Sequence, residues 1–205
     1  MKKIFLIAVI LSGILFPSCN DWLDVNPRTQ IRKDVLLETQ KGFRDVLTGA
    51  YIRLKSDGLY GGEMTWGAIE YLGKHWEPTA GQTDQYIQQY NYTNSSVKDR
   101  FANIFKTYYQ AIADVNSILE VIDDKKDIFT TGNYELIKGE ALAIRAFCHL
   151  DVLRLFGPMP TGEIKEDKIL PYVKTVTNEI HDHSTYEQFV QLLFEDLNEA
   201  EELLG

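Results

Sequence analysis

Aromatic rings interleaved with glycines are the residues best suited to chemistry in this chain, and that chemistry would be ligand binding. Between Gly58 and Ser96 helical periodicity fails, and a loop of this length in a compact domain usually has a function. Flat tyrosine and tryptophan rings stack on sugar faces and carry a polar tip for hydroxyl groups. We therefore predict ligand-binding roles for Tyr60, Trp66, Trp76, Tyr86 and Tyr90. The alternative, left open by the sequence, is that these rings pack the loop onto neighbouring helices.

The other reactive side chains are explained better without catalysis. His181-Asp182-His183 offers two imidazoles and a carboxylate, a zinc-like set, but no third ligand follows at helical spacing. Acidic side chains such as Asp196 near the C-terminus could form the carboxylate pair of a glycoside hydrolase. Beside an apolar helical stripe they fit a solvated face instead. The sequence has no Ser-His-Asp or Cys-His context. We expect no catalytic residue, no metal site, no cofactor and no enzymatic activity.

The N-terminal segment predicts export and lipidation. Two lysines precede an apolar run from Ile4 to Phe16, which is too short to span a bilayer as a helix. Cys19 stands where this run ends, the position of the acylated cysteine in a bacterial lipoprotein. We predict a lipoprotein signal peptide at residues 1–18 and lipidation of Cys19. The alternative is an ordinary signal peptide, with Cys19 as a stray thiol or disulfide partner.

Charge and cysteine content exclude further function classes. The chain carries 30 acidic and 21 basic residues, a formal net charge of −9. Phosphate binding requires a basic patch, so nucleic acid is not an expected partner, and electrostatic docking on anionic lipid is not expected either. With Cys19 acylated, no intrachain disulfide is possible. Cys148 lies in an apolar helical stretch, where a buried, inert thiol is expected.

The segments on either side of the aromatic loop are predicted to be helical. Apolar residues recur at i, i+3, i+4 and i+7 in long stretches that turn residues and prolines separate. Capping boxes are expected at Ser96 and at Ser184. The expected helices are Leu36–Lys55, a short Thr65–Leu72 inside the aromatic loop, Val97–Ile122, Tyr134–Phe156 and a last one from Ser184. Strand signals are weak, so we predict an all-α fold of tetratricopeptide-like antiparallel helix pairs with long aromatic-rich loops.

Three of these helices resemble the signature helices of the SusD/RagB family. Tyr108–Leu119 resembles the family's YxxIxxxNxIL helix, and Lys138–Pro160 resembles KGEAxxxRAFxxxxLxxxYGxxP, with Phe156 in place of the usual tyrosine. Val190–Leu204 resembles the DLxxAxxLL helix, and Trp22-Leu23-Asp24-Val25 is also typical. The resemblance covers essentially the whole chain after residue 18.

The resemblance implies a function that the residues alone do not. Family members are outer-membrane surface lipoproteins that capture glycans or other nutrients and cap a SusC-like TonB-dependent transporter. They are usually more than twice as long, so we expect residues 34–205 to be an incomplete N-terminal helical domain. Residues 19–33 would be the lipidated N-terminus and linker. The alternative function is a helical protein-interaction module without a ligand site of its own.

Overall fold

Four long helices make up the fold. The computed structural model describes residues 33–159 and 167–205, and Lys33–Gly205 forms one compact unit. The predicted signal peptide, Cys19 and the linker up to residue 32 lie outside the described residues. The long helices are α3 (Gln40–Leu54), α6 (Ser95–Leu119), α7 (Asn133–Phe156) and α8 (Tyr186–Leu204). The predicted all-α class is confirmed.

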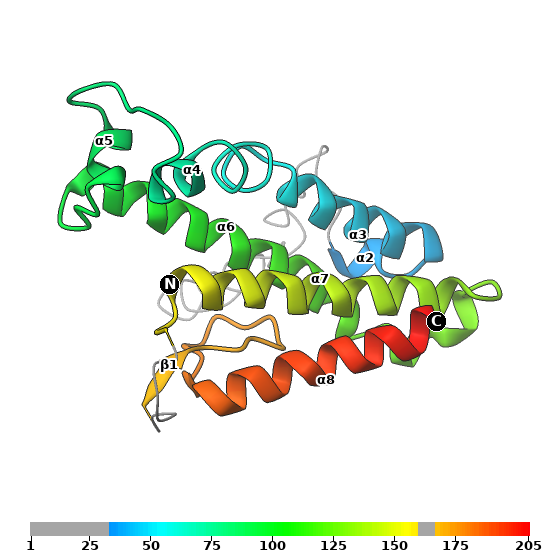
Figure 1. The fold of residues 1–205 in the computed structure, drawn as a ribbon. Coiled ribbons are helices and arrows are strands. Elements are labelled where there is room, and N and C mark those ends of the chain that lie inside the picture. The colour runs from blue at the N-terminus through cyan, green and yellow to red at the C-terminus, as the bar shows by residue number, and fades with distance from the viewer. Residues whose placement is uncertain (1–32, 160–166) are drawn as a thin grey trace, which may run out of the picture. The chain divides into compact units, whose positions relative to one another are not determined.

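The long helices pack in chain order, each against the next. α3 contacts α6, α6 contacts α7 and α7 contacts α8 (Figure 1). This succession of helix pairs is the tetratricopeptide-like arrangement that the sequence predicts. The short elements are α2 (Lys33–Leu36), α4 (Ala68–Leu72), α5 (Thr83–Gln88), the 3-10 helix η2 (Asp123–Ile128), and strands β1 (Lys168–Leu170) and β2 (Ser184–Thr185). The two strands are antiparallel, with Lys168 opposite Thr185 and Leu170 opposite Ser184.

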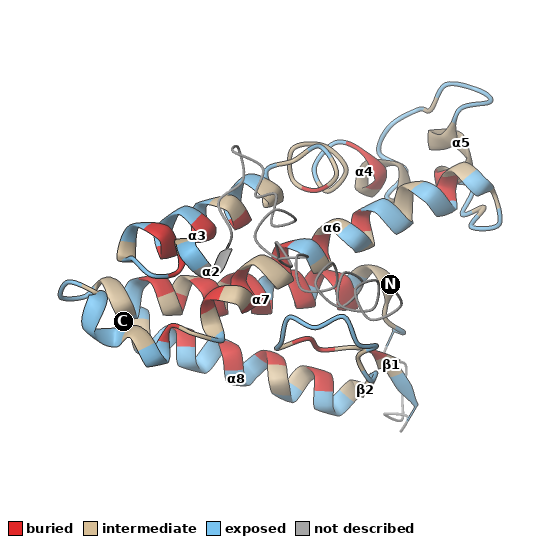
Figure 2. Ribbon diagram, turned by 180° about the vertical axis from the view of Figure 1, so that it is seen from behind, coloured by how far each residue is buried: buried red, intermediate tan, exposed pale blue. Residues whose placement is uncertain are grey.

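The core lies between the long helices because each of them turns an apolar stripe inward. On α6 the side chains of Ile104, Tyr108, Ile112 and Val115 recur every three or four residues, and all are buried. The burial colours show the same pattern, with buried positions on the inward faces and exposed ones outside (Figure 2). α7 is buried on a broader face because it packs against both α6 and α8.

The helices α3, α6 and α8 begin at residues other than the predicted ones. α3 starts after Thr39, whose side chain accepts a hydrogen bond from the first turn, so the chain is not helical at residues 37–39. For α6, Oδ1 of Asn94 accepts from the backbone N–H of Ser96 at 2.9 Å, and the predicted capping box at Ser96 is wrong. Thr185 and Gln188 form the capping box of α8, one residue later than predicted.

A buried ion pair joins α7 to α8. Nε and Nη2 of Arg145 donate to the two carboxylate oxygens of Asp196 at 2.7 and 2.6 Å. Only 7% of the arginine side chain and 2% of the aspartate side chain are exposed. Arg145 also donates to Oδ1 of Asn116 at 3.0 Å, and Tyr172 donates to Asp196 at 2.5 Å. The prediction that Asp196 belongs to a solvated face is therefore wrong, because this carboxylate lies in the core.

His149 lies beside this ion pair as a neutral ring. Its Nε2 accepts a hydrogen bond from the backbone N–H of Val173 at 3.0 Å, and its Nδ1 is 2.9 Å from the carbonyl oxygen of Arg145. These two contacts place the single ring proton on Nδ1. Burial lowers the pKa of His149 from 6.5 to about 3. The neighbouring Cys148 is free and buried, and burial raises the pKa of its thiol to about 12, as expected for an inert cysteine.

Candidate functional site

The aromatic segment is an ordered excursion from the helix stack between α3 and α6, and we call residues 58–94 the aromatic excursion (Figure 1). It contains the expected short helix α4, which begins at Ala68 rather than at Thr65. It also contains α5, which the sequence did not reveal because its six residues are mostly polar and only Ile87 is buried. Consecutive turns connect these helices, so the excursion has little periodicity to detect.

Arg100 of α6 holds the aromatic excursion at two points. Its guanidinium forms an ion pair with Glu63 at 2.7 Å and a second ion pair with Asp84 of α5. Glu63 also accepts a hydrogen bond from the backbone N–H of Ala68 at 2.9 Å, which fixes the start of α4. These three charged side chains are 21% to 28% exposed, so water screens them only in part. One arginine therefore links α4 and α5 to the helix stack.

We expect the substitution Arg100→Met to loosen the aromatic excursion while leaving the helix stack folded. It removes the cation between Glu63 and Asp84 and leaves two partly buried carboxylates without their partner. Amide hydrogen exchange within residues 63–90 should accelerate at least ~10-fold, whereas exchange in α7 and α8 should not change. Arg44→Met is the control, because that arginine is exposed on α3 and contacts Asn133, outside the excursion. Equal exchange profiles for the two variants would contradict the anchoring role of Arg100.

The five predicted ligand-binding residues divide by exposure. Trp66, Trp76 and Tyr90 are 56%, 47% and 47% exposed, so their rings are available to a ligand. Tyr60 and Tyr86 are partly buried and pack against the hydrophobic core. The packing alternative from the sequence thus describes two of the five residues, and the binding interpretation stays a prediction for the other three.

Tyr60 makes the clearest structural contacts of the five. Its hydroxyl donates to the buried carboxylate of Asp151 on α7, which also accepts from Tyr108 at 3.0 Å. Its ring packs on that of Phe147 with centroids 5.4 Å apart. Burial raises the pKa of Asp151, and the nearby Arg154 opposes this shift. The excursion therefore begins at a side chain fixed to α7.

Trp76 and Tyr90 lie in the same part of the excursion. The backbone carbonyl of Trp76 accepts from Gln88 at 3.0 Å, and the hydroxyl of Tyr90 donates to the carbonyl of Leu72 at 3.1 Å. The ammonium of Lys74 lies 4.8 Å from the centroid of the Tyr90 ring. Trp66 makes no ring contact within residues 33–159 and 167–205, and the structure does not bring it together with these two residues.

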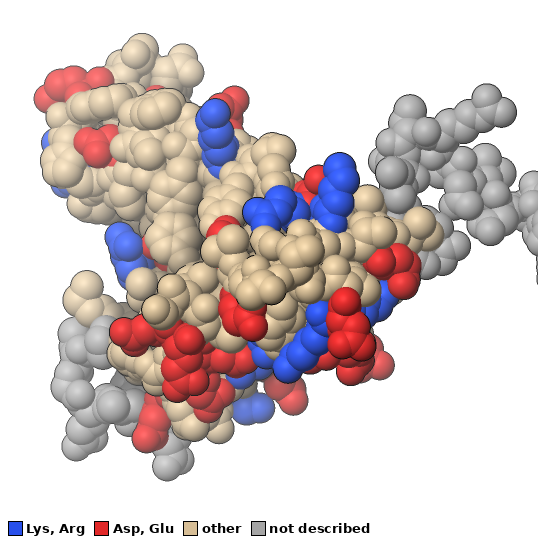
Figure 3. All heavy atoms as spheres, turned by 90° about the vertical axis from the view of Figure 1, so that its right-hand side faces the viewer, with Lys and Arg blue, Asp and Glu red and all other residues tan. Residues whose placement is uncertain are grey.

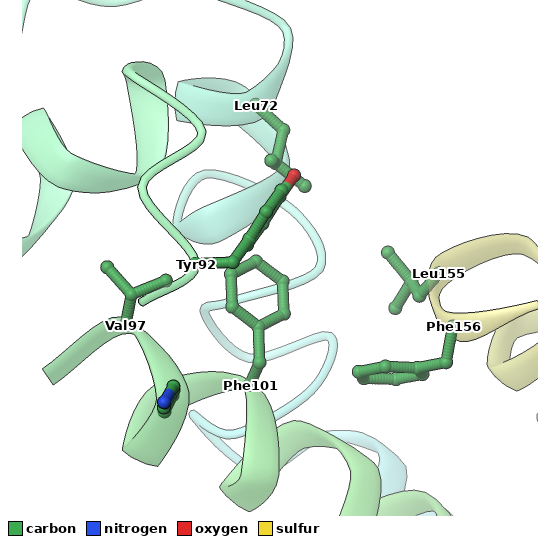
Figure 4. Close-up of a pocket in the computed structure, with 7 residues that line it drawn as sticks. Leu72, Tyr92, Val97, Phe101, Leu155 and Phe156 are labelled. Atoms are coloured by element: carbon green, nitrogen blue, oxygen red, sulfur yellow. The ribbon is translucent and has the colours of Figure 1, made fainter. Parts of the chain in front are cut away.

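A pocket of about 450 Å³ opens where the excursion meets the start of α6 and the end of α7, and we call it the aromatic pocket. Its rings lie in edge-to-face contact: the centroids of Tyr92 and Phe101 are 6.0 Å apart, and those of Phe101 and Phe156 are 6.4 Å apart. Figure 4 draws its lining residues, with the rings of α6 and the loop facing the end of α7. The lining residues are Leu72, Tyr92, Val97, Lys98, Phe101, Leu155 and Phe156.

The aromatic pocket suits a neutral ligand with an apolar face. Its polar groups are the hydroxyl of Tyr92 and the ammonium of Lys98, and no carboxylate lines it. Burial, and then the neighbouring Tyr90, raise the pKa of Tyr92, so this phenol stays a neutral hydrogen-bond donor at physiological pH. The volume lies within the range of small-molecule sites, and rings with a few polar groups are typical of such sites.

None of the five predicted residues lines the aromatic pocket, although Tyr90 adjoins it. The ring of Tyr90 lies 6.5 Å from that of Tyr92. Phe101 falls in the expected helix Val97–Ile122 and Phe156 in the signature Lys138–Pro160, so neither was predicted to bind a ligand. The one available signal was the proximity of Tyr92 to the start of α6 in a segment already identified as aromatic.

Other kinds of site find little support in the described part of the chain. Within residues 33–159 and 167–205, no three His, Cys, Asp or Glu side chains converge in a way that could hold a metal ion. The charged residues on the face shown in Figure 3 are mixed, and the basic ones form no continuous patch there. None of the helices in these ranges has the length and apolar character needed to cross a membrane.

Comparisons with known proteins agree with this architecture. Residues 21–205 match the model of a SusD-like family described as starch-binding associating with outer membrane. The chain is 22% identical over 159 residues to SusD-like protein P25 of Formosa agariphila, covering 70% of this chain and 28% of that protein.

Two solved structures show a similar fold. A SusD superfamily protein of Bacteroides vulgatus superposes with a TM-score of 0.61 at 24% identity, over 82% of this chain and 35% of that one. A SusD homolog of Bacteroides thetaiotaomicron gives a TM-score of 0.61 at 19% identity, over 86% and 32%. The chain thus spans about a third of the length of these relatives.

Proposed function

Because this chain belongs to the SusD-like family, whose model is described as starch-binding associating with outer membrane, we propose that it is a non-enzymatic nutrient-binding lipoprotein of that membrane. The nutrient is a glycan or oligosaccharide, captured on the aromatic excursion and in the aromatic pocket. A SusC-like TonB-dependent transporter receives it. The chain spans about a third of its relatives, so these roles are proposed for the part of the binding surface that residues 33–205 supply.

The observation that carries this proposal is the aromatic pocket. Three rings from three segments of the chain line one pocket, and Lys98 and the Tyr92 hydroxyl supply polar groups at its wall. Sugar rings present apolar faces and hydroxyl rims, which match rings and polar groups of this kind. We propose that the exposed rings of Trp76 and Tyr90 extend the surface beyond the pocket, and that Tyr60 serves the scaffold instead.

The substitution Tyr92→Ala tests the ligand site. Tyr92 is 53% exposed, so its ring can be removed with little effect on folding. Loss of one stacking ring and its hydroxyl should weaken glycan binding about 10-fold, measured by isothermal titration calorimetry with a glycan that the unmodified chain binds. Tyr51→Ala is the matched control, because Tyr51 is 46% exposed on α3 and does not line the aromatic pocket. Equal affinities of the two variants would exclude the aromatic pocket as the site.

The anchor is tested at Cys19, which lies outside the described residues. Cells fed a labelled fatty acid should incorporate the label into the chain, and Cys19→Ala should abolish that incorporation. Cys148→Ala is the control, since this thiol is buried in α7 and its replacement should leave labelling unchanged. Label that persists in Cys19→Ala would argue for the ordinary signal peptide that the sequence leaves as the alternative.

The second candidate function is a protein-interaction module, which exposed apolar side chains on two neighbouring helices favour. Phe147 and Leu150 of α7 are 42% and 39% exposed, and Phe194 and Leu197 of α8 are 56% and 38% exposed. Exposed apolar side chains on adjacent helices are typical of contact surfaces. The two functions are compatible. A chain that recovers a transporter from outer membranes but binds no glycan would favour the module alone.

A further inference from the structure

A second depression, on the side of the fold where α3 meets α6, differs in chemistry from the aromatic pocket. Its volume is about 420 Å³, and we call it the polar depression. Its lining includes the side chains of Arg53, Ser56, Asn103, Thr107 and Gln110, but no aromatic ring and no carboxylate. The two pockets share no lining residue, so a substitution in one leaves the lining of the other intact.

Ser56 presents an unsatisfied hydroxyl in the polar depression. Its Oγ is the one buried side-chain nitrogen or oxygen in residues 33–159 and 167–205 that has no hydrogen-bond partner. The backbone of Ser56 is fixed, because its carbonyl accepts from the N–H groups of Leu59 and Gly61, both at 2.9 Å. A buried hydroxyl without a partner is destabilising, and such groups in folded proteins call for an explanation.

Gly58 marks the point where three polar side chains converge. A Cβ atom built on this glycine would lie 3.3 Å from Nδ2 of Asn103, 3.4 Å from Oγ1 of Thr107 and 3.9 Å from Oγ of Ser56. The amide of Asn103 and the hydroxyls of Thr107 and Ser56 therefore lie close together beside Gly58. A ligand hydroxyl that reaches this point of the depression would meet donors and acceptors of both kinds.

The electrostatics of the polar depression favour a neutral ligand. The Arg53 guanidinium, the one charged group of the lining, donates to Asp114 at 2.7 Å, so its charge is already paired. An anion would therefore find no unpaired cation among the lining residues, and a metal ion would find no carboxylate or imidazole. A lining of amide and hydroxyl groups, in which the one charged side chain is already paired, is suited to a compound that carries several hydroxyl groups.

We propose that the polar depression between α3 and α6 is a second binding site, for a small neutral polyhydroxylated ligand such as a single sugar ring or a polyol. The ligand places a hydroxyl beside Gly58, where it hydrogen-bonds with Ser56 Oγ, Thr107 Oγ1 and the amide of Asn103. This site is distinct from the aromatic pocket and stands without the proposed glycan function.

Residue-resolved NMR titration of the 15N-labelled chain with methyl glucoside and with sorbitol tests the proposal. At least one probe should give saturable shifts of the backbone signals of Ser56, Gly58 and Asn103. Gly58→Ala, which places a methyl group against Asn103 Nδ2 and Thr107 Oγ1, should lower the affinity at least ~10-fold. Gly49→Ala is the matched control, because Gly49 also lines the depression but a Cβ there meets no atom within 4 Å. Its affinity should stay within about 2-fold of the parent chain.

A second variant, Ser56→Ala, separates a ligand role from a structural one. It removes the unpartnered hydroxyl, so binding should weaken while the melting temperature stays unchanged or rises. A lower melting temperature would mean that the hydroxyl serves the fold, for instance through a bound water, and would overturn the proposal. The absence of saturable shifts, or shifts confined to Tyr92 and Phe101, would overturn it too. The latter result would still support the aromatic pocket, so the two proposals fail separately.

Discussion

Replacing Arg145 by methionine is expected to lower the free energy of unfolding by about 3–5 kcal/mol. The substitution keeps an unbranched side chain of similar length but removes the cation from a carboxylate that is 2% exposed. Asp196 would then keep the hydrogen bond from Tyr172 at 2.5 Å and the more distant ammonium of Lys174 at 4.0 Å, and Asn116 would lose a donor as well. The large effect arises from the buried charge that remains, more than from the net stabilisation by the pair.

Urea denaturation followed by circular dichroism measures this effect. The double variant Arg145→Met with Asp196→Leu should recover part of the lost stability, because it removes both charges together. Lys41→Met is the control for a surface pair, since Lys41 and Asp45 are 82% and 46% exposed, and should cost less than about 1 kcal/mol. If the Arg145 and Lys41 variants were equally stable, the buried ion pair would not be the link between α7 and α8 that we infer.

The stability of the chain is expected to fall as the pH drops below 6.5, and His149 is the reason. The folded protein holds this ring neutral, with its pKa lowered to about 3, whereas the unfolded chain binds a proton near pH 6.5. Between these values the unfolded state binds more protons, so acid favours unfolding. The contribution of His149 is fully present above pH 6.5 and is lost progressively toward pH 3. The full slope of one proton is about 1.4 kcal/mol per pH unit.

The pH window from 6.5 to 5 suits this test, because it lies above the ordinary pKa values of carboxyl groups. Asp151, whose pKa burial raises, is the same in the parent chain and in both variants. His149→Gln should flatten the dependence of the unfolding free energy on pH across that window, although the variant is less stable overall. His183→Gln, which alters an exposed histidine, should keep the slope of the parent chain. A slope that survives in His149→Gln would show that another group carries the acid sensitivity, and that the hydrogen bond to Val173 does not hold the ring neutral.

The helices were predictable because their apolar stripes are strong, whereas polar groups in the core were not. The stripe of α6 contains Ile104, Tyr108, Ile112 and Val115, all of which are buried. Asp196 looked like a surface residue because its sequence neighbours are acidic, and nothing in the local sequence shows that Arg145 lies opposite. The two residues of this pair lie 51 positions apart in the sequence and on different helices, so only the assembled fold reveals it.

The candidate site was predictable as a segment but not as a set of residues. Glycine and aromatic content identified the excursion, yet sequence alone did not separate exposed rings such as Trp76 from Tyr60, whose hydroxyl is bound to α7. The aromatic pocket also takes Phe101 and Phe156 from helices whose periodicity indicated scaffold. A residue at the edge of an apolar stripe can line a pocket when a loop, here the one carrying Tyr92, passes over it.

The most direct test of the account is whether the folded chain binds a polysaccharide through the aromatic pocket. Native affinity electrophoresis in gels that contain starch or other soluble glycans measures this, with Tyr92→Ala and Tyr51→Ala run beside the parent chain. We predict that at least one glycan retards the parent chain and Tyr51→Ala, and that Tyr92→Ala migrates faster than both in that gel. Retardation of all three to the same extent, or of none while circular dichroism shows them folded, would contradict the account.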